Sequence, residues 1–281
     1  TAPGETEEGG NEGSELEDDQ GGKSVKRRVS RHWRPAPRGR AFRKPLLKVM
    51  ERQKKRVLER LGLIEPKGLA VKDLNLDALP LDLSMFADED LPLLRPAMEM
   101  YYEQGARRAH ARTGAALGWW SVELPQVRDA IDRAALQLSK ATAQTTTMEL
   151  TRAVEKLKDD LAEGIISGEN TPRALRQVVE QVFTNAETWR ANRIAVTEAS
   201  RAVHDGQILQ AEMSGVVEGF DVLLSPTACD ICVDAYAEQP YVGLGEAGAM
   251  VGSFDRGLPP FHPNCECSFT ERLRQIEGVN D

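Results

Sequence analysis

The stretch PPFHPNCEC (Pro259–Cys267), together with CDIC (Cys229–Cys232), decides how the C-terminal third of the chain can fold. These two stretches contain all four cysteines of the protein, and His262 precedes the second cysteine pair. From Ser225 to Phe261 the chain has many Gly and Pro but few periodic apolar positions. Because so short a region has too little core of its own, we expect a crosslink to stabilise it.

Five side chains in these stretches are candidate metal ligands: Cys229, Cys232, His262, Cys265 and Cys267. Two cysteines separated by two residues can place both thiolates on one ion, and a second pair from a distant loop completes a tetrahedral zinc site. Cys229 and Cys232 form the first half. The second half is Cys265 with Cys267, or His262 with one of these two. We therefore expect a structural zinc ion.

Two other interpretations of the cysteines compete with structural zinc. Disulfide pairing is disfavoured because the sequence has the features of a cytosolic chain, whose thiols stay reduced. A catalytic zinc needs an open position beside a general base, and no His-x-Glu pair precedes the cysteines, although Glu266 lies between two of them. His262 has an alternative role, orienting its loop through a hydrogen bond. We expect no catalytic residue and no enzyme activity.

A longer pattern resembles a known family. The run RIAVTE (Arg193–Glu198), then Gly206, CDIC and HPNCEC, is similar to the C-terminal domain of Mu F-like head morphogenesis proteins of tailed bacteriophages. That family carries a Thr-Glu pair on a helix, a Cys-x-x-Cys and a terminal His-Pro-x-Cys-x-Cys. The likeness covers about residues 145–270. This chain departs from the family at Phe220, at the Ser-Pro pair 225–226 and at Glu266, where Trp, Asp and Arg are frequent.

The resemblance implies a minor head protein near the portal vertex that assists capsid assembly and DNA packaging or ejection. Its partners would be portal, capsid or scaffold proteins, and it would reside in the virion after assembly in the host cytoplasm. Some members are fused to a portal protein, so the start at Thr1 suggests a processed product or the tail of a longer chain. The alternatives are a zinc-containing nuclease or effector delivered with the phage genome and, more weakly, a DNA-binding protein unrelated to virions.

The Thr-Glu pair of this pattern, Thr197 and Glu198, has two interpretations. In the first, Thr197 packs in the protein and Glu198 makes a local salt bridge or caps a loop. In the second, Glu198 contacts Arg201 or the cysteine module and so holds the helix to the sheet. A catalytic role would need a base and an orienting group that the sequence does not offer. We therefore expect both residues to be structural.

The N-terminal charges are strongly segregated. Residues 1–22 hold eight carboxylates and no Lys or Arg, so we expect disorder there. Residues 23–60 have a net charge of +14, and the remaining chain has −14. Such an arm is either a solvated linker or a surface that binds double-stranded DNA through phosphates, with an aromatic to stack on bases. The candidate nucleic-acid contacts are Lys26, Arg27, Arg28, Arg31, Trp33, Arg34, Arg38, Arg40, Arg43 and Lys44.

The periodicity of apolar residues predicts an α+β fold, with a mostly helical N-terminal and central region followed by a small Cys/His-stapled module with short strands. We expect helices over 44–61, from about 90 toward 114, over 125–168 with a break in the Thr-rich stretch 140–147, from 171, and over 186–213. A strand should follow over 216–224. No run of 18 apolar residues predicts a membrane segment.

We expect five regions along the chain. They are an acidic disordered segment (1–22), a basic arm with an amphipathic helix (23–62), a helical region with a connector (63–147), the Mu F-like domain (148–270) and a tail (271–281).

Overall fold

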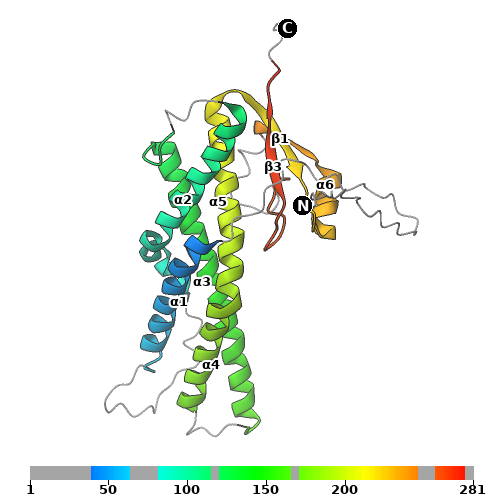
Figure 1. Cartoon of the computed structure of the whole chain (residues 1–281). Helices are drawn as coiled ribbons and strands as arrows, with labels where there is room; N and C mark the ends of the chain where they lie inside the picture. Colours follow the sequence, from blue (N-terminus) through cyan, green and yellow to red (C-terminus); the bar gives the residue numbers. More distant parts are fainter. Residues whose placement is uncertain (1–38, 64–81, 115–119, 166–170, 246–256, 276–281) are drawn as a thin grey trace, which may run out of the picture.

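The α+β fold class is confirmed by a computed structural model of the chain. The structure describes residues 39–63, 82–114, 120–165, 171–245 and 257–275. Helices make up most of this part, and a small antiparallel sheet lies near its C-terminal end (Figure 1). The acidic segment 1–22, residues 23–38 of the basic arm, residues 64–81 of the connector and residues 276–281 of the tail lie outside the described residues.

In the described ranges, five long helices form the bundle: α1 (Arg40–Arg60), α2 (Ala87–Thr113), α3 (Pro125–Ala162), α4 (Thr171–Asn185) and α5 (Ala191–Ser214). Short turns precede two of them, the 3-10 turn η2 (Leu83–Phe86) before α2 and the π-helical turn η4 (Ala186–Arg190) before α5. In Figure 1, α5 runs along the bundle and leads directly into the sheet at one end. It therefore belongs to both parts of the molecule.

The tightest helix contact joins α2 to α5 through two glycines. A Cβ added to Gly105 would lie 2.0 Å from the carbonyl oxygen of Val203, and one added to Gly206 would lie 2.2 Å from that of Tyr102. These distances are far below van der Waals contact, so the two backbones can touch only because neither residue has a side chain. Aromatic and aliphatic side chains of α1, α2, α3 and α5 fill the core around this contact.

Helix α3 is continuous, and the expected break in its Thr-rich middle is wrong. The hydroxyls of Thr142, Thr145 and Thr146 each donate to the carbonyl four residues earlier, at 2.8–2.9 Å. These internal bonds satisfy the polar groups, so Thr142 and Thr146 are buried within the helix interface. Helix α3 thus runs without interruption across the expected boundary between the regions 63–147 and 148–270.

Other element boundaries also differ from expectation. Helix α2 begins at Ala87, three residues before the expected start near 90, and it contains both Pro92 and Pro96. Helix α3 ends at Ala162, where Gly164 has a left-handed φ of 73°, and the expected stop at 168 lies outside the described residues. The apolar pattern of the expected 186–213 helix places Trp189 on its inward face, and this prediction is wrong. The helix opens with the π turn, and Trp189 is exposed.

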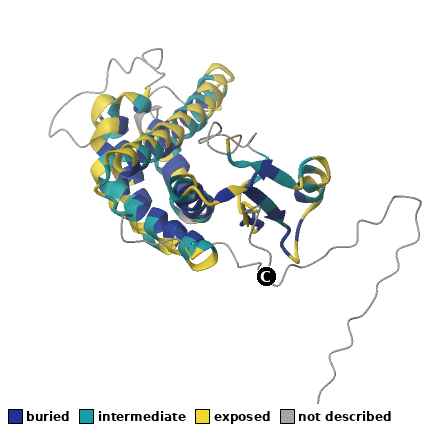
Figure 2. Cartoon of the chain, turned by 90° about the horizontal axis from the view of Figure 1, so that it is seen from above, coloured by how far each residue is buried: buried dark blue, intermediate teal, exposed yellow. Residues whose placement is uncertain are grey.

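The sheet has the strand order β2-β1-β3, with all neighbours antiparallel. Strand β1 (Val217–Leu223) is central, and it pairs with β2 (Tyr241–Gly243) and β3 (Ser268–Leu273). A short helix, α6 (Asp230–Glu238), interrupts the region expected to be loop. Seen along the bundle, the sheet and α6 lie to one side of it (Figure 2). The rings of Phe220 and Phe269 pack edge to face, with their centroids 4.9 Å apart.

No helix in the described ranges has an apolar stretch long enough to cross a membrane.

Candidate metal centre

The two cysteine pairs lie at the ends of short elements. Cys229 immediately precedes α6 and Cys232 lies in its first turn, so one helical turn brings both thiols to the same side. Cys265 and Cys267 lie directly before β3. Asn264 adopts a left-handed φ of 60°, which turns the chain so that the Cys265 amide donates to the His262 carbonyl at 3.2 Å. This turn places His262 beside the cysteines.

All five candidate ligands meet in one cluster. The Nε2 atom of His262 lies 3.2 Å from the Cys229 sulfur and 3.1 Å from the Cys232 sulfur. The Cys232 sulfur lies 3.8 Å from that of Cys229 and 3.6 Å from that of Cys265. Two triads have mutually close ligand atoms, Cys229–Cys232–His262 and Cys232–Cys265–Cys267. Cys232 belongs to both, so it is the centre of the cluster.

The spacing of the sulfur atoms suits a bound metal ion. Two thiolates at about 2.3 Å from one tetrahedral zinc-type ion lie about 3.8 Å apart. The two Sγ–Sγ separations at Cys232, 3.8 and 3.6 Å, agree with that edge length. A disulfide would need about 2.05 Å between sulfurs, and all four cysteines are free. The cluster can therefore hold a metal ion.

The surroundings of the thiols differ. Cys232, Cys265 and Cys267 are buried, whereas Cys229 is exposed. Burial raises the pKa of Cys232 to about 12. A hydrogen bond with Cys267 lowers the pKa of Cys265 to about 5, and the same contact raises the pKa of Cys267. Of the three buried thiols, Cys265 is thus the one whose thiolate form the surroundings favour, and a cation in the cluster would favour the thiolate form of the other two.

Groups outside the cluster orient its ligands. The Nδ1 atom of His262 lies 2.8 Å from the Pro263 carbonyl oxygen, which favours a proton on Nδ1 and leaves Nε2 facing the cysteines. His262 is thus a candidate ligand through Nε2, and its Nδ1 makes the loop hydrogen bond considered as its alternative role. The Ser225 amide donates to the Cys267 sulfur at 3.4 Å. Glu266 accepts a hydrogen bond from Thr227 at 3.2 Å on the surface.

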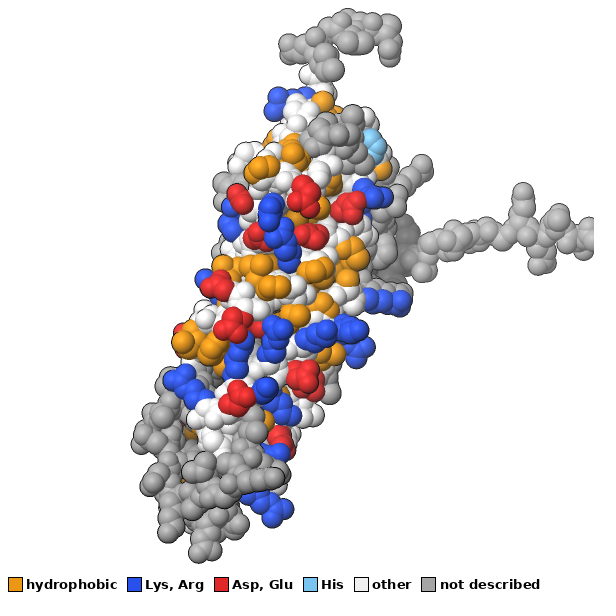
Figure 3. All heavy atoms as spheres, turned by 90° about the vertical axis from the view of Figure 1, so that its left-hand side faces the viewer, with side chains coloured by type: hydrophobic (Ala, Val, Ile, Leu, Met, Phe, Trp, Pro, Cys, Tyr) orange, Lys and Arg blue, Asp and Glu red, His pale blue; other side chains and the backbone are white. Residues whose placement is uncertain are grey.

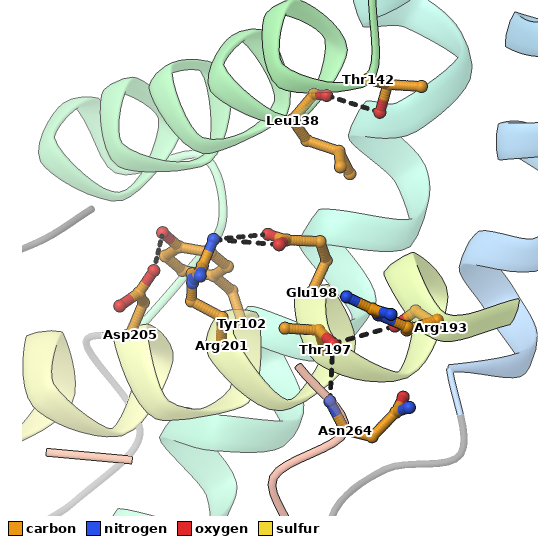
Figure 4. A network of polar contacts seen from close by, with 9 residues as sticks. All are labelled: Tyr102, Leu138, Thr142, Arg193, Thr197, Glu198, Arg201, Asp205 and Asn264. Atoms are coloured by element: carbon orange, nitrogen blue, oxygen red, sulfur yellow. Dashed lines mark hydrogen bonds and ion pairs between the residues drawn. The ribbon is translucent and has the colours of Figure 1, made fainter. Parts of the chain in front are cut away.

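Helix α5 holds the turn between the ligands. The Thr197 hydroxyl accepts a hydrogen bond from the Asn264 amide at 3.0 Å and donates to the Arg193 carbonyl at 2.8 Å (Figure 4). One helical heptad later, buried His204 bonds the Pro259 carbonyl through Nδ1 at 2.8 Å. Thr197 thus links the bundle by a hydrogen bond to the loop that carries His262 and Cys265, a more specific role than packing alone.

Glu198 makes a local salt bridge. Its two carboxylate oxygens lie 2.9 and 3.2 Å from Nη1 of Arg201, in the network of Figure 4. The link from helix to sheet that the sequence analysis considered for Glu198 is made by Thr197, His204 and Gln207. Gln207 donates to buried Glu271 of β3 at 3.2 Å. Sequence reasoning missed His204, although its spacing of seven residues from Thr197 places both on one helix face.

Only three of the ten candidate nucleic-acid residues lie in the described part of the chain. Arg40, Arg43 and Lys44 are exposed in the first turns of α1. The other seven, Lys26, Arg27, Arg28, Arg31, Trp33, Arg34 and Arg38, lie outside the described residues. The described basic residues are far along the chain from the cysteines, and none of them belongs to the cysteine cluster.

Five donors from two distant segments thus form one cluster, with a hydroxyl and an imidazole of α5 fixing the loop that carries three of them. Comparison with known proteins adds no relative, because no family, no curated protein and no solved structure matches the chain significantly. What the site can do follows from its own residues.

Because Cys232 belongs to both triads, we expect Cys232→Ser to remove bound metal more completely than Cys229→Ser. The loss should also lower the thermal midpoint, since metal binding to such a site contributes to the free energy of folding. Metal content by mass spectrometry and a melting curve on the same sample measure both effects. Ile231→Ser is the matched control, because Ile231 is exposed between the two cysteines. Equal metal content in Cys232→Ser and Ile231→Ser would contradict the assignment.

Replacing Thr197 by Val keeps its shape but leaves the Asn264 amide without its acceptor. We expect a loss of about 1–3 kcal/mol in the free energy of unfolding, measured by denaturant titration. Thr197→Ser retains the hydroxyl and should lose much less. If the Val and Ser variants unfold alike, the hydrogen bond to Asn264 does not stabilise the loop.

Proposed function

We propose that the chain is a minor head protein of a tailed bacteriophage that acts near the portal vertex, where it assists capsid assembly and DNA packaging or ejection. Its partners are then portal, capsid or scaffold proteins and double-stranded DNA, and it resides in the virion after assembly in the host cytoplasm. One observation carries the proposal. The separate parts of the Mu F-like pattern, Thr197 of the Thr-Glu pair and the Cys and His residues, gather in one site.

The pattern could have been scattered over the molecule by chance. Instead, the hydroxyl of Thr197 contacts the loop that carries His262 and Cys265, across a sequence separation of 67 residues to Asn264. Gly206, also part of the pattern, allows the close contact of α5 with α2. Thr197, Gly206 and the Cys and His residues of the pattern thus each make a structural contact in the same part of the fold. This supports a shared fold with the Mu F-like domain.

We propose that the metal is zinc and that its role is structural. Thiolate and imidazole donors suit zinc, which prefers a tetrahedral set of four. The cluster offers five protein donors for four positions, so protein side chains can fill every position and leave none for a reacting water. When bound, the ion would crosslink α6 to the loop before β3. A closed site of this kind supports assembly rather than nuclease chemistry.

The basic surface of α1 supports the DNA-binding part of the proposal. Arg40, Lys44 and Lys48 are exposed at four-residue steps, which puts them on one stripe of the helix. Figure 3 shows Lys and Arg side chains gathered in a band across the face that carries α1 and α2. Such a stripe can neutralise successive phosphates of a nucleic-acid backbone.

In a phage that encodes this chain, we expect its gene to lie among the portal and scaffold genes and the protein to be present in purified heads. Changing Cys232 to Ser in the phage genome should lower the infectious titre, because the metal-crosslinked module would no longer fold. Ile231→Ser should leave the titre unchanged. Heads that lack the protein, or equal titres for the two variants, would argue against a role in head assembly.

Neutralising Arg40, Arg43 and Lys44 to Gln should weaken DNA binding and reduce its salt dependence. If all three residues contact phosphates, the plot of the logarithm of the binding constant against the logarithm of the salt concentration becomes less steep. Its slope decreases in magnitude by up to about 2.7, at about 0.9 per contact. Fluorescence titration at several salt concentrations measures this slope. The triple variant is preferable to removing residues 1–60, because Phe42 and Leu46 of α1 are fully buried in the core.

The matched control neutralises three exposed basic residues elsewhere, Arg152, Lys156 and Arg173. If both triple variants change the slope equally, the effect comes from net charge and not from the surface of α1.

A further inference from the structure

The four cysteines differ in how easily a reagent in solution can reach them. Cys229 is exposed, whereas Cys232, Cys265 and Cys267 are buried. Cys229 immediately precedes α6, and α6 lies on the side of the module away from the bundle in Figures 1 and 2. Ile231, in the first turn of the same helix, is exposed as well. A small oxidant therefore meets the sulfur of Cys229 before that of any other cysteine.

Cys229 and Cys232 have the geometry of a pair that can close into a disulfide. Cys229 is the N-cap of α6, and the Val233 amide donates to its carbonyl at 3.0 Å, which closes the first helical turn. Cα atoms three residues apart in such a turn lie about 5 Å from each other. This separation is within the range of about 4.4–6.8 Å that disulfides span. The two sulfurs are 3.8 Å apart, so rotation of the side chains can bring them to bonding distance.

The arrangement of the cluster also selects the partner of Cys229. Among the described residues, the triad that contains Cys229 includes one other cysteine, Cys232. Cys265 and Cys267 belong to the second triad, which does not contain Cys229. An oxidised sulfur at Cys229 would therefore react with Cys232 and not with the cysteines of the loop before β3.

Cys232 is the residue whose loss would affect the cluster most. It belongs to both triads, so no triad remains among the described residues once Cys232 is part of a disulfide. The new bond would stay within the first turn of α6, because both of its cysteines belong to that turn. Oxidation would therefore remove the metal crosslink between α6 and the loop before β3 without replacing it by a covalent one.

We propose that Cys229 and Cys232 are a redox modification site, at which hydrogen peroxide converts the metal-binding pair into a disulfide and releases the metal. The proposal rests on the metal site of the proposed function and adds its regulation. First, the Cys229 sulfur attacks one peroxide oxygen, the O–O bond breaks, and a sulfenic acid and water form. The Cys232 sulfur then attacks that of Cys229, the S–S bond forms, and the hydroxyl leaves as water with the thiol proton. Two electrons pass from the sulfurs to the peroxide.

The modification would make the structure of the module depend on the redox conditions. In a reducing cytoplasm both thiols stay reduced and available to a metal. In the presence of peroxide, the loop before β3 would keep its hydrogen bonds with Thr197 and His204 of α5 but lose its link to α6. Helix α6 would then be the part that is released, while the loop stays on the bundle.

The test is to treat the full-length, zinc-loaded protein with hydrogen peroxide and to follow released zinc with a chromogenic chelator. We expect one zinc ion to be released for each disulfide formed, and peptide mapping by mass spectrometry should place the disulfide between Cys229 and Cys232. A dithiol reductant with added zinc should restore the metal content. A disulfide that includes Cys265 or Cys267, or zinc release without any disulfide, would overturn the proposal.

Cys229→His keeps a metal donor at the exposed position but removes its thiol. For each bound zinc ion, we expect release by peroxide to be at least about tenfold slower in this variant, because the remaining thiols are buried. Ile231→Ser is the matched control, since it changes an exposed residue of the same turn and keeps both thiols. It should release zinc as the wild type does. Equal release rates in the two variants would contradict the role of Cys229.

Failure of the redox site can be distinguished from failure of the proposed function. The zinc content of the untreated protein tests the metal site alone. A chain that binds no zinc would contradict the metal site, and with it the release step. A zinc-bound chain that forms no disulfide between Cys229 and Cys232 in peroxide would contradict the redox site alone.

Discussion

The backbone contact between α2 and α5 at Gly105 and Gly206 is the constraint on which the rest of the structure depends. Any side chain at either position would push the two helices apart, because the nearest atoms of the partner are backbone and cannot rotate away. With the helices this close, buried Tyr102 reaches Asp205 with its hydroxyl. The contact thus fixes the rotation of α5 about its axis. That rotation decides which residues of α5 face the core and which face the cysteine module.

The cysteine module depends on that rotation because it has little core of its own. Its sheet contributes a few buried side chains, among them Phe220 and Phe269, and these pack against α5 at Ile208 and Ala211. The remaining connections are polar and specific, from Thr197 and His204 to the ligand loop and from Gln207 to Glu271. Burial raises the pKa of Glu271, and Arg112 of α2 lies 3.4 Å from its carboxylate. Helix, sheet and the loop that carries the candidate ligands therefore stabilise one another.

Sequence patterns predicted the parts of this arrangement that depend on local order. Gly215 ends α5 with a φ of 69°, and Val217–Leu223 forms the expected strand, because glycine conformation and β-branched composition act within a few residues. The five donors could be named because their spacing is itself local. The continuity of α3 could not be predicted, since propensity counts Thr as unfavourable and ignores the bond each hydroxyl makes four residues back. The exposure of Trp189 could not be predicted either, because a π turn shifts the helical phase at that point.

The basic helix and the metal-ligand loop meet on the same turn of α5. Gly39, at the start of α1, contacts the backbone of Ala195, and the Asn264 amide contacts Thr197 two residues later. Both contacts fall within one turn of α5, so the start of α1 and the ligand loop are positioned by the same short stretch of helix. A metal that orders the loop would therefore act close to the site where the basic arm leaves the bundle. The two surfaces are distant in sequence, but they share one support in the fold.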